Sequence, residues 1–288
     1  MSTGDTMILT KQGYVPIACK ENQVIEVWNG KEWDKCIPKH AGWLQNVIEI
    51  TFSNGMLIKC LPTYQFYGDV DHTSSIKPGM NLEICDFEAC PDDQEDIRFP
   101  YEQGVLTAKS AAGVLGLTAW LKSFFVHTPV NLHTPFNAGT ASKLKWLEGV
   151  FDFYYDYSLK HDCFLATYDK PSERGVFFNE VPTMAERQLL REILLLLQSL
   201  GVPCTITAGE PEKLELSIIG AKRLLKLGFA PRKFLGKFLM KPRPADFAVT
   251  VVSVCEYPYP EDVFTVTEPA GRKAVMNGVV TCQRGIEV

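Results

Sequence analysis

The stretch WLEGVFDFYY, residues 146–155, lies in a run whose apolar side chains recur at helical spacing from 141 to 159. This period predicts one helix over that run. The stretch combines Leu147, Gly149 and Asp152, and it has Tyr154 two places after the aspartate. The patterns on either side of this helix predict how the chain is divided into domains.

C-terminal to this helix, strand and helix patterns alternate regularly. Strand patterns are expected at 162–169 and 174–180, and again at 202–209 and 213–220. Between the two pairs, a helix over 182–201 begins with a capping box of Thr183 and Glu186 and ends at a glycine. A short helix is expected at 221–229. Together with the first helix these elements make one αββαββα unit.

The two ends of the chain show strand patterns instead. Residues 7–17, 23–36 and 48–60 alternate apolar and polar side chains, and the last two runs contain the hairpin signals Asn29-Gly30 and Asn54-Gly55. Helical pattern follows at about 102–125, and strand pattern returns over 246–283. The sequence therefore predicts an α+β fold. Residues 1–100 and 245–288 form an all-β domain from both termini, and residues 101–244 form an inserted domain.

The charge balance bears on the choice of partner. The chain has 29 basic and 34 acidic residues, a formal net charge of −5. Proteins that track duplex DNA usually carry a positive excess, because neutralising phosphates drives their binding. One stretch, residues 222–244, is dense in cations and is either a solvated surface or a nucleic-acid contact. Its candidate contacts are Lys222, Arg223, Lys226, Arg232 and Lys233.

The remaining composition indicates a protein of the cell interior. The first ten residues lack the basic start and apolar stretch of a secretory signal. No apolar run reaches the roughly 18–20 residues of a membrane span. The nine cysteines are scattered without a CxxC pair, so we expect reduced structural thiols rather than a metal site. We therefore expect a cytoplasmic location, no membrane insertion and no cofactor.

In this order, the segments resemble an intein, a Hint splicing domain interrupted by a LAGLIDADG homing endonuclease. The resemblance is closest to the inteins of ribonucleotide reductase large subunits. TGDTMILTKQGYVPI resembles the opening block and NGMLIKCLPTYQFY the second splicing block. KLKWLEGVFDF, with the helix and strands that follow it, resembles an endonuclease half. DVFTVTEPAGRKAVMNGVVTCQ resembles the closing blocks.

The resemblance assigns splicing roles to positions that do not carry the expected groups. A thiol or hydroxyl nucleophile is expected at Met1, and a threonine and a histidine for polarisation and proton transfer at Leu61 and Tyr64. The degenerate closing positions are Arg272, Gln283 and Arg284. A thioether, an aliphatic side chain and a phenol do not replace these groups. We therefore predict that the chain does not splice.

The resemblance likewise implies one metal-binding carboxylate at the foot of each of two paired helices. Those two positions hold Lys109 and Tyr154, neither of which is a ligand for a hard cation. The resemblance also implies that most of the first endonuclease repeat is deleted before residue 127. Asp152 and Asp156 remain near the second position as residual acids. We predict no metal site and no nuclease activity, with residual cleavage left open.

The favoured hypothesis is a non-catalytic, repurposed intein relative that binds other proteins as an adaptor, in a phage or another DNA virus and hence in the host cytoplasm. The candidate partner-binding residues are Trp28, Trp33, Trp43, Tyr257 and Tyr259, since aromatic side chains favour interface cores. Each of them is equally suited to pack the Hint core. The alternatives are a free-standing homing endonuclease acting as a homodimer and a DNA-binding protein without cleavage.

Overall fold

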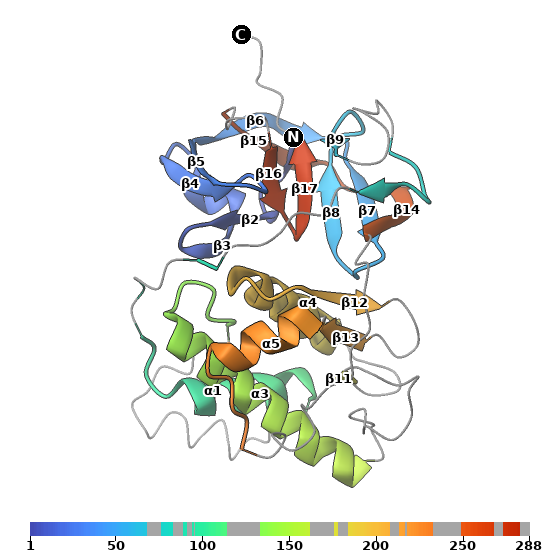
Figure 1. Cartoon of the computed structure of the whole chain (residues 1–288). Helices are drawn as coiled ribbons and strands as arrows, with labels where there is room; N and C mark the ends of the chain where they lie inside the picture. Colours follow the sequence, from blue (N-terminus) through green and yellow to red (C-terminus); the bar gives the residue numbers. More distant parts are fainter. Residues whose placement is uncertain are drawn as a thin grey trace. The chain divides into compact units, whose positions relative to one another are not determined.

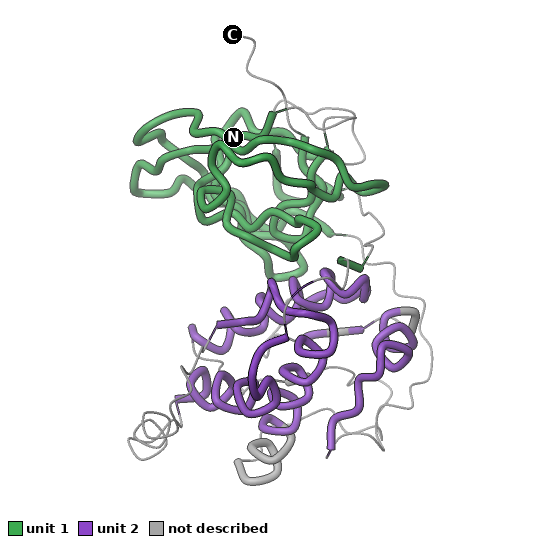
Figure 2. The backbone as a smooth tube through the Cα atoms, turned by 90° about the vertical axis from the view of Figure 1, so that its left-hand side faces the viewer, with its two compact units in different colours: residues 1–91, 246–288 green, residues 92–245 purple. Residues whose placement is uncertain are grey.

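The computed structural model describes most of the chain and divides it into two compact units, residues 1–91 with 246–288 and residues 92–245 (Figure 2). The described residues are 1–67, 76–82, 89–90, 94, 96–113, 133–161, 176–177, 184–207, 213–216, 218–232, 249–267 and 273–282. The mixed α+β class predicted from the sequence is confirmed.

The first unit consists of antiparallel strands from both ends of the chain. Its N-terminal elements are β1 (Ser2–Thr3), β2 (Met7–Thr10), β3 (Gly13–Pro16), the 3-10 helix η1 (Ile17–Lys20), β4 (Ile25–Trp28), β5 (Trp33–Cys36), β6 (Pro38–Gln45), β7 (Ile48–Phe52), β8 (Leu57–Cys60), β9 (Gln65–Phe66) and β10 (Asn81–Leu82). Its C-terminal elements are β14 (Val249–Glu256), β15 (Glu261–Val266), β16 (Lys273–Met276) and β17 (Val279–Cys282).

Each sheet contains strands from both ends of the chain. The first sheet has the order β10-β14-β7-β8-β1-β15-β6, and the second has the order β5-β4-β2-β16-β17-β9, with β3 paired to β2. In Figure 1 the blue strands of the N-terminal end lie beside the red strands of the C-terminal end. Neither segment completes a sheet alone, so strands from the two ends of the chain fold as one unit.

Asn277 joins the two sheets at a tight turn. Asn277 and Gly278 have φ of 46° and 77° between the paired residues Met276 and Val279, which is the conformation of a two-residue hairpin that favours Asn-Gly. The side-chain oxygen of Asn277 accepts a hydrogen bond from Met7 N in the second sheet at 2.7 Å. Its amide nitrogen donates to Leu57 O in the first sheet at 2.5 Å.

The second unit has helices packed with a small sheet. Its described elements are α1 (Pro100–Ala111), α3 (Thr140–His161), β11 (Val176–Phe177), α4 (Met184–Ser199), β12 (Cys204–Thr207), β13 (Lys213–Leu216) and α5 (Ile218–Lys226). The sheet has the order β11-β13-β12. This order of elements follows the αββαββα prediction, except that the strand expected at 162–169 lies outside the described residues.

Two predicted boundaries are corrected by the structure. Within the helix expected over 102–125, α1 ends at Ala111, and Gly113 beyond it has φ of +69°, the left-handed conformation that often terminates a helix. Residues 114–125 lie outside the described residues. The strand expected over 213–220 ends at Leu216, and α5 begins at Ile218. Ser217 stands between them in the sequence, and serine is a favoured residue before a helix.

Candidate functional sites

The positions that the intein resemblance assigns to splicing lie together in the first unit. Ser2 of β1 pairs with Cys60 of β8 and with Phe264 of β15. Leu61 N donates a hydrogen bond to Met1 O at 3.0 Å, and Tyr64 N donates to Leu61 O at 2.9 Å. Cys282, the last residue of β17, pairs with Gln65. The backbone therefore brings the beginning and the end of the sequence to the same place as Leu61 and Tyr64.

The side chain of Tyr64 is part of the core at this place. It is 5% exposed, its hydroxyl donates to the sulfur of Met276 at 3.2 Å, and its ring packs edge-on against Phe66 at 5.1 Å. A phenol has an ordinary pKa near 10 and is a poor proton shuttle at neutral pH. Arg272, Gln283 and Arg284 lie outside the described residues. The assigned positions that the structure describes, Met1, Leu61 and Tyr64, carry a thioether, an aliphatic side chain and a phenol.

Cys60 is the thiol nearest in the chain to these positions. Burial raises the pKa of Cys60 to about 12, and only the thiolate is an effective nucleophile. Burial likewise raises the pKa of Cys36 to about 12. Cys19 and Cys255 are exposed. Cys60 therefore does not replace the nucleophile that position 1 lacks.

We predict a matching order of thiol alkylation. At pH 8 iodoacetamide should modify Cys19 and Cys255 within minutes and leave Cys60 and Cys36 unmodified until the protein unfolds, because raised pKa and burial both protect a thiol. Peptide mass spectrometry of a time course measures this order, and modification in urea is the positive control. Alkylation of Cys60 as fast as Cys19 in the folded protein would contradict the description of this site.

The second candidate site is the seam between α1 and α3. A Cβ atom added at Gly104 of α1 would lie 2.0 Å from Trp146 O, and one added at Gly149 of α3 would lie 2.1 Å from Tyr101 O. Each glycine therefore faces a backbone carbonyl of the other helix, and that carbonyl belongs to the residue three positions before the other helix's glycine. The two helices pack backbone against backbone in a reciprocal arrangement, which only glycine allows at such a distance.

The two positions expected to carry metal-binding carboxylates lie equally far along the sequence from the glycine of their own helix. Lys109 lies five residues after Gly104, and Tyr154 lies five residues after Gly149. Lys109 is half-buried, and Tyr154 is 2% exposed with its ring 5.1 Å from Phe153. Within the described part of the chain, no three His, Cys, Asp or Glu side chains are grouped to hold a metal ion. An ammonium and a phenol give a hard cation no anionic oxygen ligand.

The residual acid Asp152 is used to hold the fold of the second unit. It is 1% exposed, and its Oδ2 accepts hydrogen bonds from the hydroxyl of Tyr101 at 2.9 Å and from Arg232 N at 2.9 Å. One turn earlier on α3, Glu148 is also 1% exposed and accepts from Ala230 N at 3.0 Å. The two carboxylates therefore attach the segment after α5 to α3. The side chain of Asp156 lies outside the described part of the structure.

Sequence reasoning missed this use of Glu148 and the role of the two glycines. The signal for the glycines was present in the sequence. GVLTAKS in α1 and GVFDFYY in α3 each begin with a glycine five residues before the position expected to carry a metal-binding carboxylate. The signal for Glu148 was absent, because its partner is a backbone N–H 82 residues away. Backbone donors leave no trace in the sequence.

The basic stretch presents cations at the surface of the second unit. Lys222, Arg223 and Lys226 of α5 are exposed, although Arg223 also donates to Gly201 O at 2.5 Å. Arg232 is exposed, and its guanidinium lies 4.2 Å from the centre of the Tyr101 ring. Lys233 lies outside the described residues. These side chains are exposed, and Arg223 and Arg232 also contact other parts of the second unit. The stretch therefore fits both a solvated surface and a nucleic-acid contact.

The five aromatic candidates separate into buried and exposed residues. Trp28 is 3% exposed and packs against half-buried Trp33, with ring centres 5.2 Å apart. Because Trp28 and Trp33 are paired across the β4–β5 hairpin, Trp28 offers no surface to a partner, contrary to the prediction. Trp43 and Tyr259 are 72% and 67% exposed.

The two exposed rings belong to the same end of the first sheet. Gln45 and Glu261 are the outermost pair of the β6–β15 ladder, and Trp43 and Tyr259 each precede one of these residues by two positions. Half-buried Tyr257 contacts Tyr259, with ring centres 5.9 Å apart. Leu44 beside Trp43 is 71% exposed. Exposed aromatic and aliphatic side chains at one sheet end are able to bind an apolar surface.

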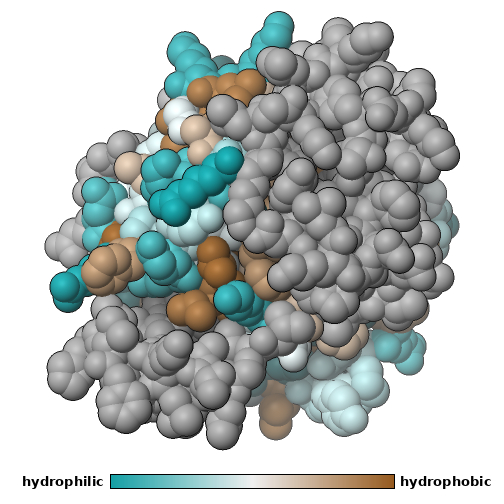
Figure 3. Space-filling model, turned by 90° about the horizontal axis from the view of Figure 1, so that it is seen from below, coloured by the Kyte–Doolittle hydropathy of each residue, from teal (hydrophilic) through white to brown (hydrophobic). Residues whose placement is uncertain are grey.

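Among the described residues, no helix is long and apolar enough to cross a membrane. On the face shown in Figure 3, the hydrophobic residues, in brown, are interspersed with hydrophilic ones, in teal.

Comparisons with known proteins found one similar sequence and similar solved structures. No protein-family model matches the chain. A ribonucleoside-diphosphate reductase large subunit of Invertebrate iridescent virus 6 is 25% identical over 338 residues, covering 97% of this chain. The chain spans only 35% of the length of that relative.

Two solved intein structures are also similar. A crystal structure of a mutant Ssp DnaB mini-intein covers 98% of both chains at 10% identity, with a TM-score of 0.39. A crystal structure of the Msm DnaB1 intein splicing domain bound with zinc covers 28% of this chain and 68% of its own, at 16% identity and a TM-score of 0.25. The chain is thus similar in sequence, over nearly its whole length, to part of a viral ribonucleoside-diphosphate reductase large subunit.

Proposed function

We propose that the chain is a non-catalytic intein relative that acts as a protein-binding adaptor. The observation that carries the proposal is the burial of two tyrosines at the positions where chemistry is expected. Tyr64 is 5% exposed and Tyr154 is 2% exposed, and both pack within cores. A reactive residue must reach its substrate, whereas these side chains stabilise the fold. Loss of chemistry with retention of packing favours a binding role.

Trp43 and Tyr259 are the proposed anchors for a partner. Both are large, flat and mostly exposed, and such side chains contribute strongly to binding when a partner buries them. The negative net charge of the chain favours a protein partner over DNA. The viral origin of the relative supports a role in the cell of a phage or DNA-virus host.

Affinity purification from the native host with quantitative mass spectrometry tests this role. The natural chain should retain a defined set of proteins, and the double variant Trp43→Ala, Tyr259→Ala should lose most of that set. Met184→Ala is the matched control, because Met184 is 80% exposed and lies in the second unit. Equal retention by the double variant and the control would refute these anchors.

We predict no autoprocessing. Residues 2–283 placed between two reporter domains should yield only the full-length precursor, because Leu61 and Tyr64 replace the groups that polarise the amide and transfer its proton. Immunoblotting for both reporters measures the products. An active intein between the same reporters is the control, and ligated reporters from the natural chain would sink the non-catalytic proposal.

DNA binding is the second candidate function, and the exposed cations of α5 favour it. We expect weak, non-specific binding with a shallow salt dependence, because few phosphates are neutralised. Replacing Lys222, Arg223, Lys226, Arg232 and Lys233 with alanine should abolish any mobility shift, whereas replacing Lys31 and Lys39 in the first unit should not. Nanomolar affinity for one defined site at physiological salt would favour DNA binding as the function.

The packing of α1 on α3 bears on the homodimeric endonuclease alternative. A dimeric enzyme of this kind would pair the same glycine-bearing helix from two chains, but here Gly149 already contacts Tyr101 of the same chain. Only 28 residues separate the end of α1 from the start of α3, too few for a second ββαββα segment. These observations favour the adaptor over the endonuclease. Homodimerisation through another surface stays open.

A further inference from the structure

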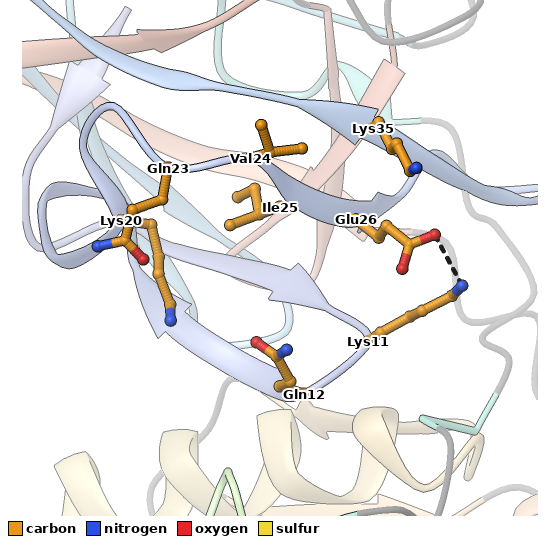
Figure 4. A pocket seen from close by; sticks show the side chains of 8 residues that line it. All are labelled: Lys11, Gln12, Lys20, Gln23, Val24, Ile25, Glu26 and Lys35. Carbon is orange, nitrogen blue, oxygen red and sulfur yellow. Dashed lines mark hydrogen bonds and ion pairs between the residues drawn. The ribbon is translucent and has the colours of Figure 1, made fainter.

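A cavity of about 290 Å³ opens in the first unit on residues that neither the splicing positions nor the aromatic anchors use. Lysines and glutamines dominate its lining, with one acid and two aliphatic residues. The lining residues are Lys11, Gln12, Lys20, Gln23, Val24, Ile25, Glu26 and Lys35 (Figure 4).

Four separate segments supply these side chains. Lys11 and Gln12 form the turn between β2 and β3, Lys20 ends η1, residues 23–26 lead into β4, and Lys35 lies on β5. Backbone pairing sets their positions, because Lys11 N donates to Glu26 O at 3.0 Å and Glu26 pairs with Lys35 across the hairpin. The cavity is therefore held by the sheet and not by a single flexible loop.

The lining carries an excess of positive charge. The ammonium of Lys11 lies 2.8 Å from a carboxylate oxygen of Glu26, so these two charges offset each other. Within the described part of the chain, Lys20 and Lys35 have no acid at ion-pair distance. The eight residues thus carry a formal charge of +2 in a chain whose net charge is −5. A concave site of this sign attracts an anion.

Figure 4 shows how the charges are spread around an apolar middle. Lys20 and Gln23 lie at one end, Lys11, Glu26 and Lys35 lie at the other, and Val24 and Ile25 lie between them. Val24 is 66% exposed. A ligand that spans the cavity would meet cations and amides through its polar part and aliphatic carbon through the rest.

We propose that this cavity binds a small-molecule phosphate monoester. Such an ester carries close to two negative charges at neutral pH and strong acceptor oxygens, which matches the two unpaired lysines and the amides of Gln12 and Gln23. The cations are all lysines, which bind phosphate as compact point charges. The aliphatic middle suits the organic part of the ester. This site is independent of the protein-binding role.

Calorimetric titration with phenyl phosphate tests the site, with phenyl sulfate and inorganic phosphate as matched probes. Phenyl sulfate has the same ring and a tetrahedral head with one charge fewer, so it should bind at least several-fold more weakly. Inorganic phosphate lacks the ring, and we expect it to bind more weakly than phenyl phosphate. Equal affinity for phenyl phosphate and phenyl sulfate would overturn the proposed charge match.

Three variants test whether binding of phenyl phosphate requires the lysines of this cavity rather than any surface lysine. Lys20→Gln with Lys35→Gln should weaken phenyl phosphate binding at least about tenfold, since two charge-assisted contacts are removed. Lys39→Gln, an exposed lysine outside the lining, is the control and should change nothing. Glu26→Gln should strengthen binding, because it removes the only acid of the lining.

Two further results would overturn the proposal. One is unchanged binding to the Lys20→Gln, Lys35→Gln variant, and the other is binding of a phosphoserine peptide in the absence of any binding of phenyl phosphate. The second result would assign the cavity to a phosphorylated protein. Circular dichroism of each variant confirms folding, and all the substituted residues are at least partly exposed.

Discussion

Replacement of Gly149 with alanine is expected to unfold the helix pair of the second unit. The added Cβ would lie 2.1 Å from Tyr101 O and 3.0 Å from Val105 N. Both atoms belong to the backbone of α1, so no side chain can rotate away and the two helices must separate. Overpacking a core costs about 1–3 kcal/mol when side chains can adjust, and we expect at least 3 kcal/mol here. Gly104→Ala should have a similar effect for the same reason.

Hydrogen exchange of the α1 and α3 amides measures this loss of stability within the second unit. The control is Gly113→Ala, where an added Cβ meets nothing within 4 Å but φ is +69°. Its cost should be only the backbone strain of about 1–2 kcal/mol. Unchanged protection of α1 and α3 in Gly149→Ala would contradict the described packing.

Restoring an acid at Tyr154 is expected to destabilise the protein without creating a nuclease. Tyr154 is 2% exposed, so Tyr154→Asp would remove a packed ring and bury a carboxylate that loses its hydration. Large-to-small changes at buried aromatic residues cost about 3–5 kcal/mol, and the buried charge adds to this. Urea unfolding should show a loss of about 4 kcal/mol or more for Tyr154→Asp. Tyr154→Phe, which keeps the ring, should lose less than about 1.5 kcal/mol.

The same variant tests the metal chemistry. The position of matching phase on α1 holds Lys109, whose positive charge repels a divalent cation. Mg²⁺ or Mn²⁺ should therefore leave the thermal stability of both the natural chain and Tyr154→Asp unchanged, since a ligand that binds only the folded state would raise it. Metal-dependent nicking of plasmid DNA by the natural chain, abolished by Asp152→Asn, would prove the proposed loss of activity wrong.

Much of the first unit was predictable because its signals are local. Alternating strand patterns and the Asn29-Gly30 and Asn54-Gly55 turns predicted the hairpins β4–β5 and β7–β8, which the structure contains. The ordered sequence blocks also indicated that both termini share one unit. The order of strands within its sheets was not predictable, since pairs such as β1–β15 join residues about 260 positions apart.

The sequence predicted which positions belong to the candidate sites, but not the contacts or the burial of their side chains. The sequence showed that Leu61, Tyr64, Lys109 and Tyr154 lack the expected chemistry. It did not show that Tyr64 donates to Met276, nor that Trp28 is buried while Trp43 is exposed. Trp28 lies in a predicted strand run, whereas Trp43 belongs to β6, which lies outside the predicted runs. The burial of a strand residue depends on which other elements cover its face.

The sequence by itself determined the α+β class, the expected hairpins and the residue types at the positions assigned to chemistry, because these depend on residue type and on spacing along the chain. The tertiary structure decided the role of Asp152, which the sequence presents as a leftover metal ligand and which is instead a buried acceptor for Tyr101 and Arg232. It also forms the lysine-lined cavity, whose lining residues come from four segments of the chain. A carboxylate or an ammonium acquires its function from the charges and donors around it, and long-range backbone pairing places those groups.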